Sequence, residues 1–323
     1  MNIEFLEALE EMAKEEGIER DVLYEMVKKG LAAAYREEFN VEREVQVDID
    51  HNSGDIFIDG EQIDLNQFGR IASKKAEDII RQEIRRRQNE LNYENYAHRK
   101  GELVNGSVHR FEGRDVWLNL GEVEAKLPES ERVPGEHYTQ GSNLRAYLYD
   151  VKKENGSPLI LVSRAREAFV TRLLELEVPE IEDGLLEVVK IARDPGRRSK
   201  VAVKSLDEQI DPVGTCVGSG GSRVKEITRE LNGEKIDVIR WSDDLSQLIR
   251  NSLEPATVLS INFEEPEEDE KPKRALVIVP QEDLAYAIGK KGQNVRLTVE
   301  LTGCEIDVRS PEEAEEELNS IES

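Results

Sequence analysis

The chain of 323 residues has few cysteines and histidines, and each shortage excludes a class of chemistry. Two cysteines, Cys216 and Cys304, are too few for a disulfide framework or a cysteine metal cluster. Both lie among apolar residues, so we expect them to be small core side chains. The four histidines lie in separate, mostly polar contexts without metal-ligand or catalytic spacing: His51, His98, His109 and His137. The sequence therefore predicts no catalytic residue, no metal site and no cofactor.

The chain also lacks a long apolar run and a surplus of basic residues. No segment approaches the length of a membrane span, and the N-terminus MNIEFLEALEE has acids where a signal peptide has cations, so we expect a cytosolic protein without membrane contact. The net charge is −25, and acids concentrate in residues 264–270 and 312–317, which we expect to be a solvated loop and tail. Cations nevertheless cluster locally, which predicts a basic groove: Arg85 to Arg87, Arg193, Arg197, Arg198 and Lys200.

What the chain does contain is an internal repeat displaced by 71 residues. Residues 214–238 and 285–308 each contain an apolar pair, a G-x-x-G turn, a helical stretch, Leu-x-Gly and a strand ending in Ile-Asp-Val. The turns run from Gly218 to Gly221 and from Gly289 to Gly292. After the turn the match shifts by one residue, which predicts a shorter helix in the second copy and a glycine cap on both helices. The cap glycines are Gly233 and Gly303.

A turn of this kind suits a phosphodiester backbone. Two glycines without Cβ atoms allow a ligand to approach the main chain, and the following helix directs its N–H groups and positive dipole end at an anion. The second turn contains Lys290 and Lys291, whereas the first contains the uncharged Ser219 and Gly220. We therefore expect the first turn to contribute less electrostatic affinity for nucleic acid than the second.

Other kinds of glycine loop are excluded by spacing. A Walker A loop needs serine or threonine where Lys291 stands, and a dinucleotide fingerprint beginning at Gly218 needs its third glycine at Arg223. A single G-x-x-G is also compatible with a simple connector between helices. Two copies with matched flanks favour a binding loop instead.

The paired units resemble KH domains, in which the G-x-x-G loop clamps about four nucleotides of single-stranded RNA. The segments around the loops, from Ile210 to Val224 and in LNGEKIDV, GKKGQNVRL and LTGCEIDV, closely resemble the NusA family of bacterial transcription elongation factors. Similar blocks at residues 68–86, 176–184 and 192–203 extend the resemblance over nearly the whole chain. The sequence departs from the family in its uncharged first loop and at Cys304, where tryptophan is common. We expect the chain to lack the acidic C-terminal repeats that some members of the family have.

The resemblance implies an N-terminal domain, residues 1–100, that binds the RNA polymerase core. Helical periodicity over residues 3–39, interrupted at Gly17 and Gly30, predicts two packed helices. Alternating apolar residues on both sides of Asn52-Ser53-Gly54 predict a hairpin, and a long amphipathic helix is expected over residues 66–96. These elements predict an α+β domain with a long exit helix.

Residues 101–165 contain five short strand patterns separated by glycine turns, which predicts a small barrel. On the second strand Val116 and Leu118 alternate with Trp117, so we expect Trp117 on the outer face. The segment resembles the OB-fold module of ribosomal protein S-one, in which that face carries stacking aromatics for single-stranded nucleic acid. The alternative is a tryptophan that packs against a neighbouring domain.

Residues 166–243 and 244–310 are predicted to form two prokaryotic-type KH domains, each with a helix, two strands, two helices and a strand. Residues 311–323 are expected to be an acidic tail. The short linker near Trp241 to Asp244 favours a fixed orientation and a continuous track for roughly eight nucleotides, at four per domain. The fold class is thus a multidomain α+β chain with an OB-fold barrel and tandem KH domains.

The sequence and its resemblance predict a non-enzymatic factor that binds RNA polymerase and nascent single-stranded RNA, and that modulates elongation, pausing, termination and antitermination. Other elongation or antitermination factors remain open as partners. Two alternatives of other classes are the RNA-binding portion of an RNA-processing enzyme and an acidic adaptor for basic proteins. The predicted RNA-binding residues are Gly218, Ser219, Gly220, Gly221, Ser222, Arg223, Lys225, Gly289, Lys290, Lys291, Gly292, Gln293, Asn294, Arg296, Trp117, Arg197 and Arg198.

Overall fold

The structure of the chain, a computed structural model, describes residues 11, 14, 19–63, 70–264 and 274–315. The chain forms two compact units, one of residues 1–99 with 151–160 and one of residues 100–150 with 161–323. Most of the first predicted helix, most of the acidic run at 264–270 and the end of the acidic tail lie outside the described residues. The two units are described separately below.

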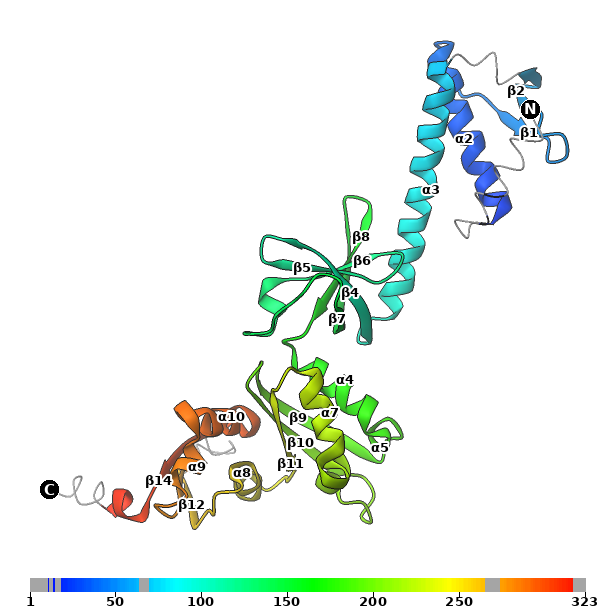
Figure 1. Ribbon diagram of the computed structural model, residues 1–323. Coiled ribbons are helices and arrows are strands. Elements are labelled where there is room, and N and C mark those ends of the chain that lie inside the picture. The colour runs from blue at the N-terminus through cyan, green and yellow to red at the C-terminus, as the bar shows by residue number, and fades with distance from the viewer. Residues whose placement is uncertain (1–10, 12–13, 15–18, 64–69, 265–273, 316–323) are drawn as a thin grey trace. The chain divides into compact units, whose positions relative to one another are not determined.

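The first unit packs helices against a small antiparallel sheet (Figure 1). Its elements are α2 (Arg20–Glu38), β1 (Val47–Ile49), β2 (Ile56–Ile58), β3 (Glu61–Ile63) and α3 (Arg70–His98). The strands pair in the order β1-β2-β3, which confirms the predicted hairpin. The third strand was not predicted, because its polar residues Glu61 and Gln62 show no apolar alternation. One core joins the helices to the sheet: Leu23, Val27, Leu31, Val47, Ile56, Ile58 and Ile84.

The prediction of a helix break at Gly30 is wrong, because α2 continues through this residue and buries it. A glycine inside a helix costs roughly 1 kcal/mol relative to alanine. Here the packing of α2 against α3 and β1 offsets that cost, since Val27, Leu31 and Ala34 are all buried. The predicted long helix corresponds to α3, and its expected first residues, 66–69, lie outside the described part of the chain. Neither α3 nor any other helix among the described residues is long and apolar enough to cross a membrane.

Five strands close into a barrel in the order β4-β5-β6-β8-β7, as the sequence predicts. They are β4 (Leu103–Glu112), β5 (Asp115–Asn119), β6 (Glu124–Leu127), β7 (Asn143–Glu154) and β8 (Ser157–Ser163). On β5 the side chains of Val116 and Leu118 are fully buried, whereas Trp117 lies on the outer face. Further inward side chains fill the barrel: Val104, Val108, Ala125, Leu127, Ala146, Leu148, Ile160 and Val162.

The hairpin between β7 and β8 is held by α3, which places this hairpin with the first unit. The side-chain amide of Asn89 donates to the carbonyl oxygen of Gly156 and to the hydroxyl of Ser157, both at 3.0 Å. The ammonium group of Lys153 lies 4.6 Å from the ring centre of Tyr93, a cation–π contact. These contacts fix the tip of the hairpin to the last turns of the long helix.

The first KH unit, defined here as α4 to β11, covers a three-stranded sheet with helices. Its elements are α4 (Glu167–Glu177), α5 (Pro179–Glu182), β9 (Leu186–Asp194), β10 (Arg198–Ser205), α6 (Pro212–Val217), α7 (Ser222–Glu230) and β11 (Lys235–Arg240). The central strand β10 is antiparallel to β9 and parallel to β11. Phe169, Val201 and Ile227 share one core with Cys216, as predicted for this cysteine. Burial raises the pKa of the Cys216 thiol to about 11, so it is not a reactive thiolate.

The second KH unit, α8 to β14, repeats this arrangement. Its elements are α8 (Leu245–Leu253), β12 (Ser260–Phe263), β13 (Arg274–Ile278), α9 (Leu284–Ile288), α10 (Gln293–Thr302) and β14 (Glu305–Arg309). The central strand β13 is antiparallel to β12 and parallel to β14. Cys304 lies in this core with Val277 and Ala287, and burial raises the pKa of its thiol. The sequence repeat is therefore a repeat of fold.

The helices after the two glycine turns end differently, and this corrects one expectation. α7 has nine residues and α10 has ten, so the helix of the second copy is not the shorter one. Gly303 takes the left-handed conformation at the end of α10 with φ of 74°. At the end of α7 that conformation is taken first by Asn232, with φ of 54°, and then by Gly233, with φ of 95°. The extra residue of the first copy lies in the turn after the helix, which a sequence match cannot locate.

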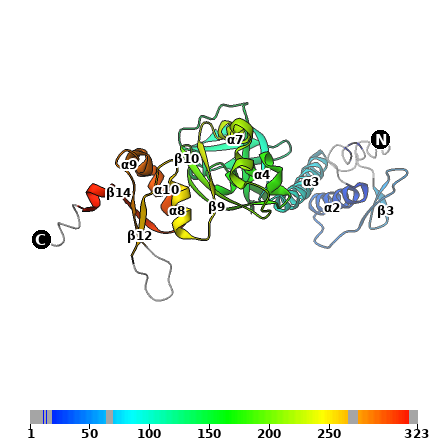
Figure 2. The same ribbon diagram turned by 90° about the horizontal axis from the view of Figure 1, so that it is seen from below.

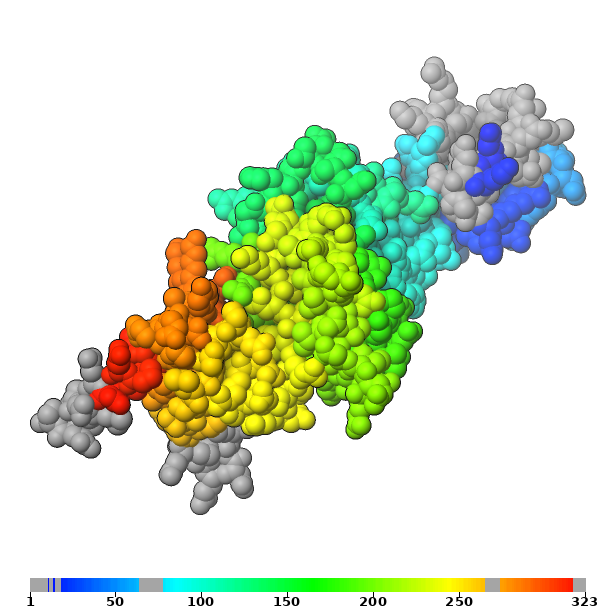
Figure 3. Space-filling model, turned by 60° about the horizontal axis from the view of Figure 1, so that its bottom comes forward, coloured from blue at the N-terminus to red at the C-terminus, as the bar shows by residue number. Residues whose placement is uncertain are grey.

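The two KH units share a buried interface. In Figures 1 and 2, α8 and α10 lie between the sheets of the two KH units. Figure 3 shows the surfaces of these two KH units in contact. Lys200 of β10 is 1% exposed and donates to the carbonyl oxygen of Ser252 in the last turn of α8, at 2.5 Å. Burial lowers the pKa of Lys200 to about 8. One apolar cluster joins the units: Ala192, Ala202, Ile239, Leu248, Leu297 and Leu301. This interface supports the predicted fixed orientation.

Candidate nucleic-acid interface

The two glycine turns have the same backbone conformation. Gly218 and Gly289 have φ and ψ of 75°, 171° and 72°, 171°. The third position of the turn is Gly220 in the first copy, at 59°, 21°, and Lys291 in the second, at 55°, 33°. The last glycines, Gly221 and Gly292, have 77°, 20° and 70°, 15°. The repeat therefore extends from residue types to dihedral angles.

The first glycine of the second turn is required for packing, and the last leaves open space. A Cβ atom on Gly289 would lie 2.8 Å from the Cβ of Asn294 and 3.0 Å from its backbone nitrogen. A Cβ atom on Gly292 would have nothing within 4 Å. Gly289 thus allows α10 to pack closely after α9, while the backbone at Gly292 stays accessible to a ligand.

The second turn combines this open backbone with two exposed cations, Lys290 and Lys291. Within the described part of the chain, neither side chain forms an ion pair or a hydrogen bond to protein. The turn leads directly into the ten-residue helix α10, whose first N–H groups carry the positive end of the helix dipole. Two free ammonium groups at such a helix end form an arrangement suited to phosphate.

The polar residues after the second turn are engaged within the protein. Asp194, at the end of β9, accepts from the side-chain amide of Gln293 at 2.7 Å and from the guanidinium of Arg296 at 2.6 Å. Asn294 is 2% exposed, and its amide donates to the carbonyl oxygen of Tyr286 at 3.1 Å. Gln293 and Arg296 therefore join the two KH units, and Asn294 joins α10 to α9. Their predicted contact with RNA stays a proposal.

The first turn has fewer available charges. Ser219 and Gly220 are exposed and uncharged. Arg223 pairs with Glu180 at 2.9 Å, while Lys225 donates to the carbonyl oxygen of Gly220 at 2.8 Å. Both cations thus support the turn and its surroundings. This arrangement supports the prediction that the first turn attracts phosphate less strongly than the second. Ser222 opens α7 directly after the turn.

The predicted basic groove is partly wrong, because two of its cations are buried. Arg193 donates two hydrogen bonds of 2.9 Å to Glu234, and Lys200 lies beneath α8. Arg198 pairs with an aspartate of β11 and is partly exposed, whereas the side chain of Arg197 is 68% exposed. A cluster of cations in sequence does not show which side chains reach acceptors inside the fold.

Trp117 lies on the outer face of the barrel, but its ring is covered. A register shift after Val108 places Arg110 opposite Trp117 on the neighbouring strand. The guanidinium of Arg110 lies 4.2 Å from the centre of the indole and is held by Glu124 at 3.1 Å. The indole Nε1 is buried without a hydrogen-bond partner in the described structure. Stacking of RNA on Trp117 stays a proposal, and it would require Arg110 to move.

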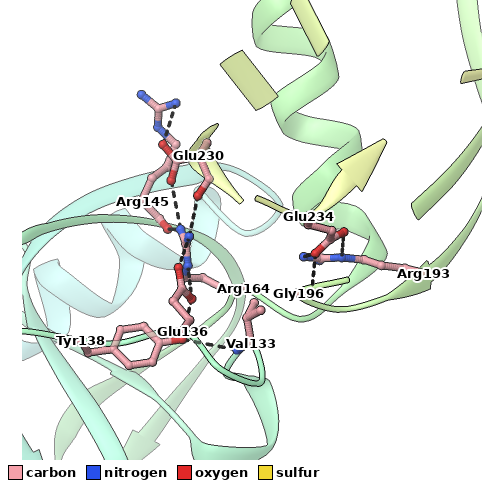
Figure 4. Close-up of polar contacts among 9 residues, drawn as sticks. All are labelled: Val133, Glu136, Tyr138, Arg145, Arg164, Arg193, Gly196, Glu230 and Glu234. Atoms are coloured by element: carbon pink, nitrogen blue, oxygen red, sulfur yellow. Dashed lines mark hydrogen bonds and ion pairs between the residues drawn. The ribbon is translucent and has the colours of Figure 1, made fainter. Parts of the chain in front are cut away.

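A buried polar network that the sequence did not reveal joins the barrel to the first KH unit (Figure 4). Arg164 is 1% exposed and donates to the carboxylates of Glu136 at 2.9 Å and Glu230 at 3.0 Å. The hydroxyl of Tyr138 donates to Glu136 at 2.7 Å, and burial raises the pKa of this hydroxyl. A network whose charges are paired in this way holds its elements in one arrangement. No sequence pattern marks it, because its members come from distant segments.

Replacing Lys291 by glycine separates backbone strain from charge. A lysine in the left-handed conformation costs about 1–2 kcal/mol, and Gly220 holds the same place in the first turn. We expect Lys291→Gly to raise the free energy of unfolding of the second KH unit by about 1 kcal/mol and to weaken phosphate binding. Hydrogen exchange of α9 and α10 and titration with single-stranded RNA measure the two effects. Lys290→Gly is the matched control, since Lys290 does not have a positive φ; a Lys291→Gly variant as unstable as this control would contradict the expectation.

Three segments of the chain match known family models. Residues 4–60 match the NusA N-terminal domain. Residues 164–241 match the NusA-like first KH domain, and residues 245–316 match the NusA-like second KH domain. The two KH matches contain the two glycine turns described above.

Relatives named transcription termination/antitermination protein NusA match nearly the whole chain. The protein of Halalkalibacterium halodurans is 37% identical, covering 98% of this chain and 90% of its own length. That of Bacillus subtilis is 35% identical, covering 98% of this chain and 93% of its own. That of Thermus thermophilus is 37% identical, covering 97% and 91%.

Proposed function

The chain belongs to the NusA family of transcription termination/antitermination proteins, and from this premise we propose that it binds the RNA polymerase core and holds nascent single-stranded RNA. We assign polymerase binding to residues 1–100 and RNA binding to a barrel at 101–165 and to KH domains at 166–243 and 244–310. Residues 311–323 form an acidic tail in this proposal. The chain has no catalytic role here, and it works in the cytoplasm, where polymerase works.

The observation that carries the RNA assignment is the second glycine turn. Lys290 and Lys291 are exposed without acidic partners among the described residues, next to the open backbone of Gly292 and the start of α10. These features favour a phosphodiester strand over a neutral ligand. If the KH track neutralises four phosphates, the logarithm of the RNA association constant falls with the logarithm of salt concentration with a slope of roughly −3.

A factor that binds polymerase through one part and RNA through another acts by raising the local concentration of the transcript at its RNA-binding surface. A chain that is bound to polymerase at one end presents its RNA surface to the emerging transcript, so that the second contact becomes intramolecular. Weak contacts can then bias hairpin formation, and with it pausing, termination or antitermination. Modest affinity for free RNA is therefore compatible with the proposed function.

The test is capture of core RNA polymerase by the full chain and by residues 101–323, each followed by titration with single-stranded RNA. We expect the shortened chain to lose polymerase and to keep RNA. The shortened chain also lacks α3, which holds the hairpin through Asn89. The full chain carrying Asn89→Ala is therefore the matched control, and it should keep both activities.

Three outcomes would reject the proposal in favour of another function. Binding of RNA without polymerase by the full chain would indicate a free RNA-binding protein. Cleavage of the probe would indicate the RNA-processing alternative. If the chain binds no RNA at any salt concentration and captures basic proteins, it is an acidic adaptor.

A further inference from the structure

The most exposed aromatic side chain among the described residues lies beside the second glycine turn. Tyr286 of α9 is 64% exposed, compared with 50% for Phe39 and 48% for Phe111. Tyr286 belongs to the short helix α9, Leu284–Ile288, which leads directly into the turn at Gly289. The surface that α9 and the turn form is coloured orange in Figure 3.

The fold does not require an aromatic ring at this position. The corresponding residue of the first repeat is Thr215, in α6 before a turn of the same conformation. In both copies the backbone carbonyl at this position accepts a hydrogen bond from the side chain eight residues later. Arg223 donates to Thr215 at 2.8 Å, and Asn294 donates to Tyr286 at 3.1 Å. The carbonyl oxygen therefore accepts the same kind of hydrogen bond whether the residue is threonine or tyrosine. This hydrogen bond does not explain why the second repeat has an aromatic ring.

The Tyr286 ring is open, unlike that of Trp117. In the described part of the structure, Tyr286 has no stacked ring, no cation over its face and no hydrogen bond from its hydroxyl to protein. Trp117, by contrast, is covered by Arg110 at 4.2 Å. The exposed ring lies four and five residues before Lys290 and Lys291, whose side chains are also exposed, so this short segment offers both an apolar surface and positive charge. This is the combination by which proteins bind single-stranded nucleic acid without sequence preference.

We propose that Tyr286 is a stacking platform for a nucleobase of the RNA strand whose phosphates the second glycine turn holds. This inference rests on the proposed RNA-binding function and adds a second, non-ionic contribution to it. Because the first repeat has Thr215 at this position, only the second KH unit has the platform at this place in the repeat. The platform strengthens binding at the turn that already has the free cations.

Two substitutions in the full chain test the platform. Tyr286→Thr introduces the residue of the first repeat, and Tyr286→Phe keeps the ring. With an unpaired single-stranded RNA of about 12 nucleotides as the probe, we expect Tyr286→Thr to raise Kd about 5- to 150-fold, and Tyr286→Phe to change it less than about twofold. The salt slope should be the same in both variants as in the unmodified chain, because stacking releases no counterions. Lys290→Gln, which removes a charge, should lower the slope instead.

Several results would overturn the platform. An unchanged Kd for Tyr286→Thr, when the unmodified chain binds the probe, rejects the inference and leaves the proposed function standing. Equal weakening by Tyr286→Phe assigns the effect to the hydroxyl and rejects stacking. Loss of polymerase capture by Tyr286→Thr with RNA affinity unchanged assigns the ring to a protein contact. If the unmodified chain does not bind RNA, the proposed function fails and the inference fails with it.

Discussion

Replacing Lys290 and Lys291 with aspartate is expected to weaken binding of single-stranded RNA by about 1,000-fold and to leave polymerase binding intact. Both side chains are exposed, so the substitutions remove no packing contact. Each attraction between an exposed ammonium group and a phosphate is worth about 1 kcal/mol in water, and charge reversal turns two attractions into two repulsions. Titration with fluorescently labelled RNA at two salt concentrations measures the loss.

The neutral double variant Lys290→Gln, Lys291→Gln separates lost attraction from new repulsion. Its RNA affinity should fall between that of the unmodified chain and that of the aspartate variant. Its salt slope should be shallower by about 1.4, at about 0.7 per single-strand phosphate. Unchanged RNA affinity in a folded aspartate variant would reject the assignment of the turn to phosphate binding. Loss of polymerase capture would indicate that this surface faces polymerase.

The order of elements in the KH units could be predicted because local patterns decide it. The predicted order of a helix, two strands, two helices and a strand is the order observed in the second unit, from α8 to β14. The predictions failed at positions where packing between distant segments determines the secondary structure. Gly30 is tolerated inside α2 because α3 and β1 cover that helix, and β3 forms because β2 offers an open edge to a polar segment.

In the candidate site, too, features set by local sequence could be predicted, and contacts between distant residues could not. Lys290 and Lys291 are the two central residues of the glycine turn, and both are exposed. This exposure could be predicted from the local sequence. Arg193 is buried because it pairs with Glu234, a residue 41 positions later. Lys200 is buried because a helix of the second KH unit covers it. Trp117 is covered because a bulge shifts the register of the neighbouring strand. Pairing over such distances is set by the folded chain and leaves no local pattern.

Replacing Glu234 by glutamine is expected to lower the free energy of unfolding of the first KH unit by about 3–5 kcal/mol. The carboxylate accepts two hydrogen bonds from Arg193 at 2.9 Å, one from the hydroxyl of Ser199 at 2.6 Å and one from the backbone of Gly196 at 2.7 Å. The side chains of Arg193 and Glu234, which face each other in Figure 4, are 1% and 0% exposed. Glutamine keeps the size but leaves the arginine charge without a counter-ion. Urea dependence of hydrogen exchange in β9, β10 and β11 measures the loss.

The matched control is Glu226→Gln on the surface of the same unit. Glu226 pairs with Arg229 at 2.7 Å, but their side chains are 46% and 75% exposed, and exposed ion pairs contribute little to stability. Losses of equal size at Glu226 and Glu234 would show that burial is not the cause. A double variant, Arg193→Met with Glu234→Leu, should be less destabilised than Glu234→Gln, because it removes the unpaired charge as well as the acceptor. If it is not, the cost lies in the orphaned donors of Ser199 and Gly196 rather than in the arginine.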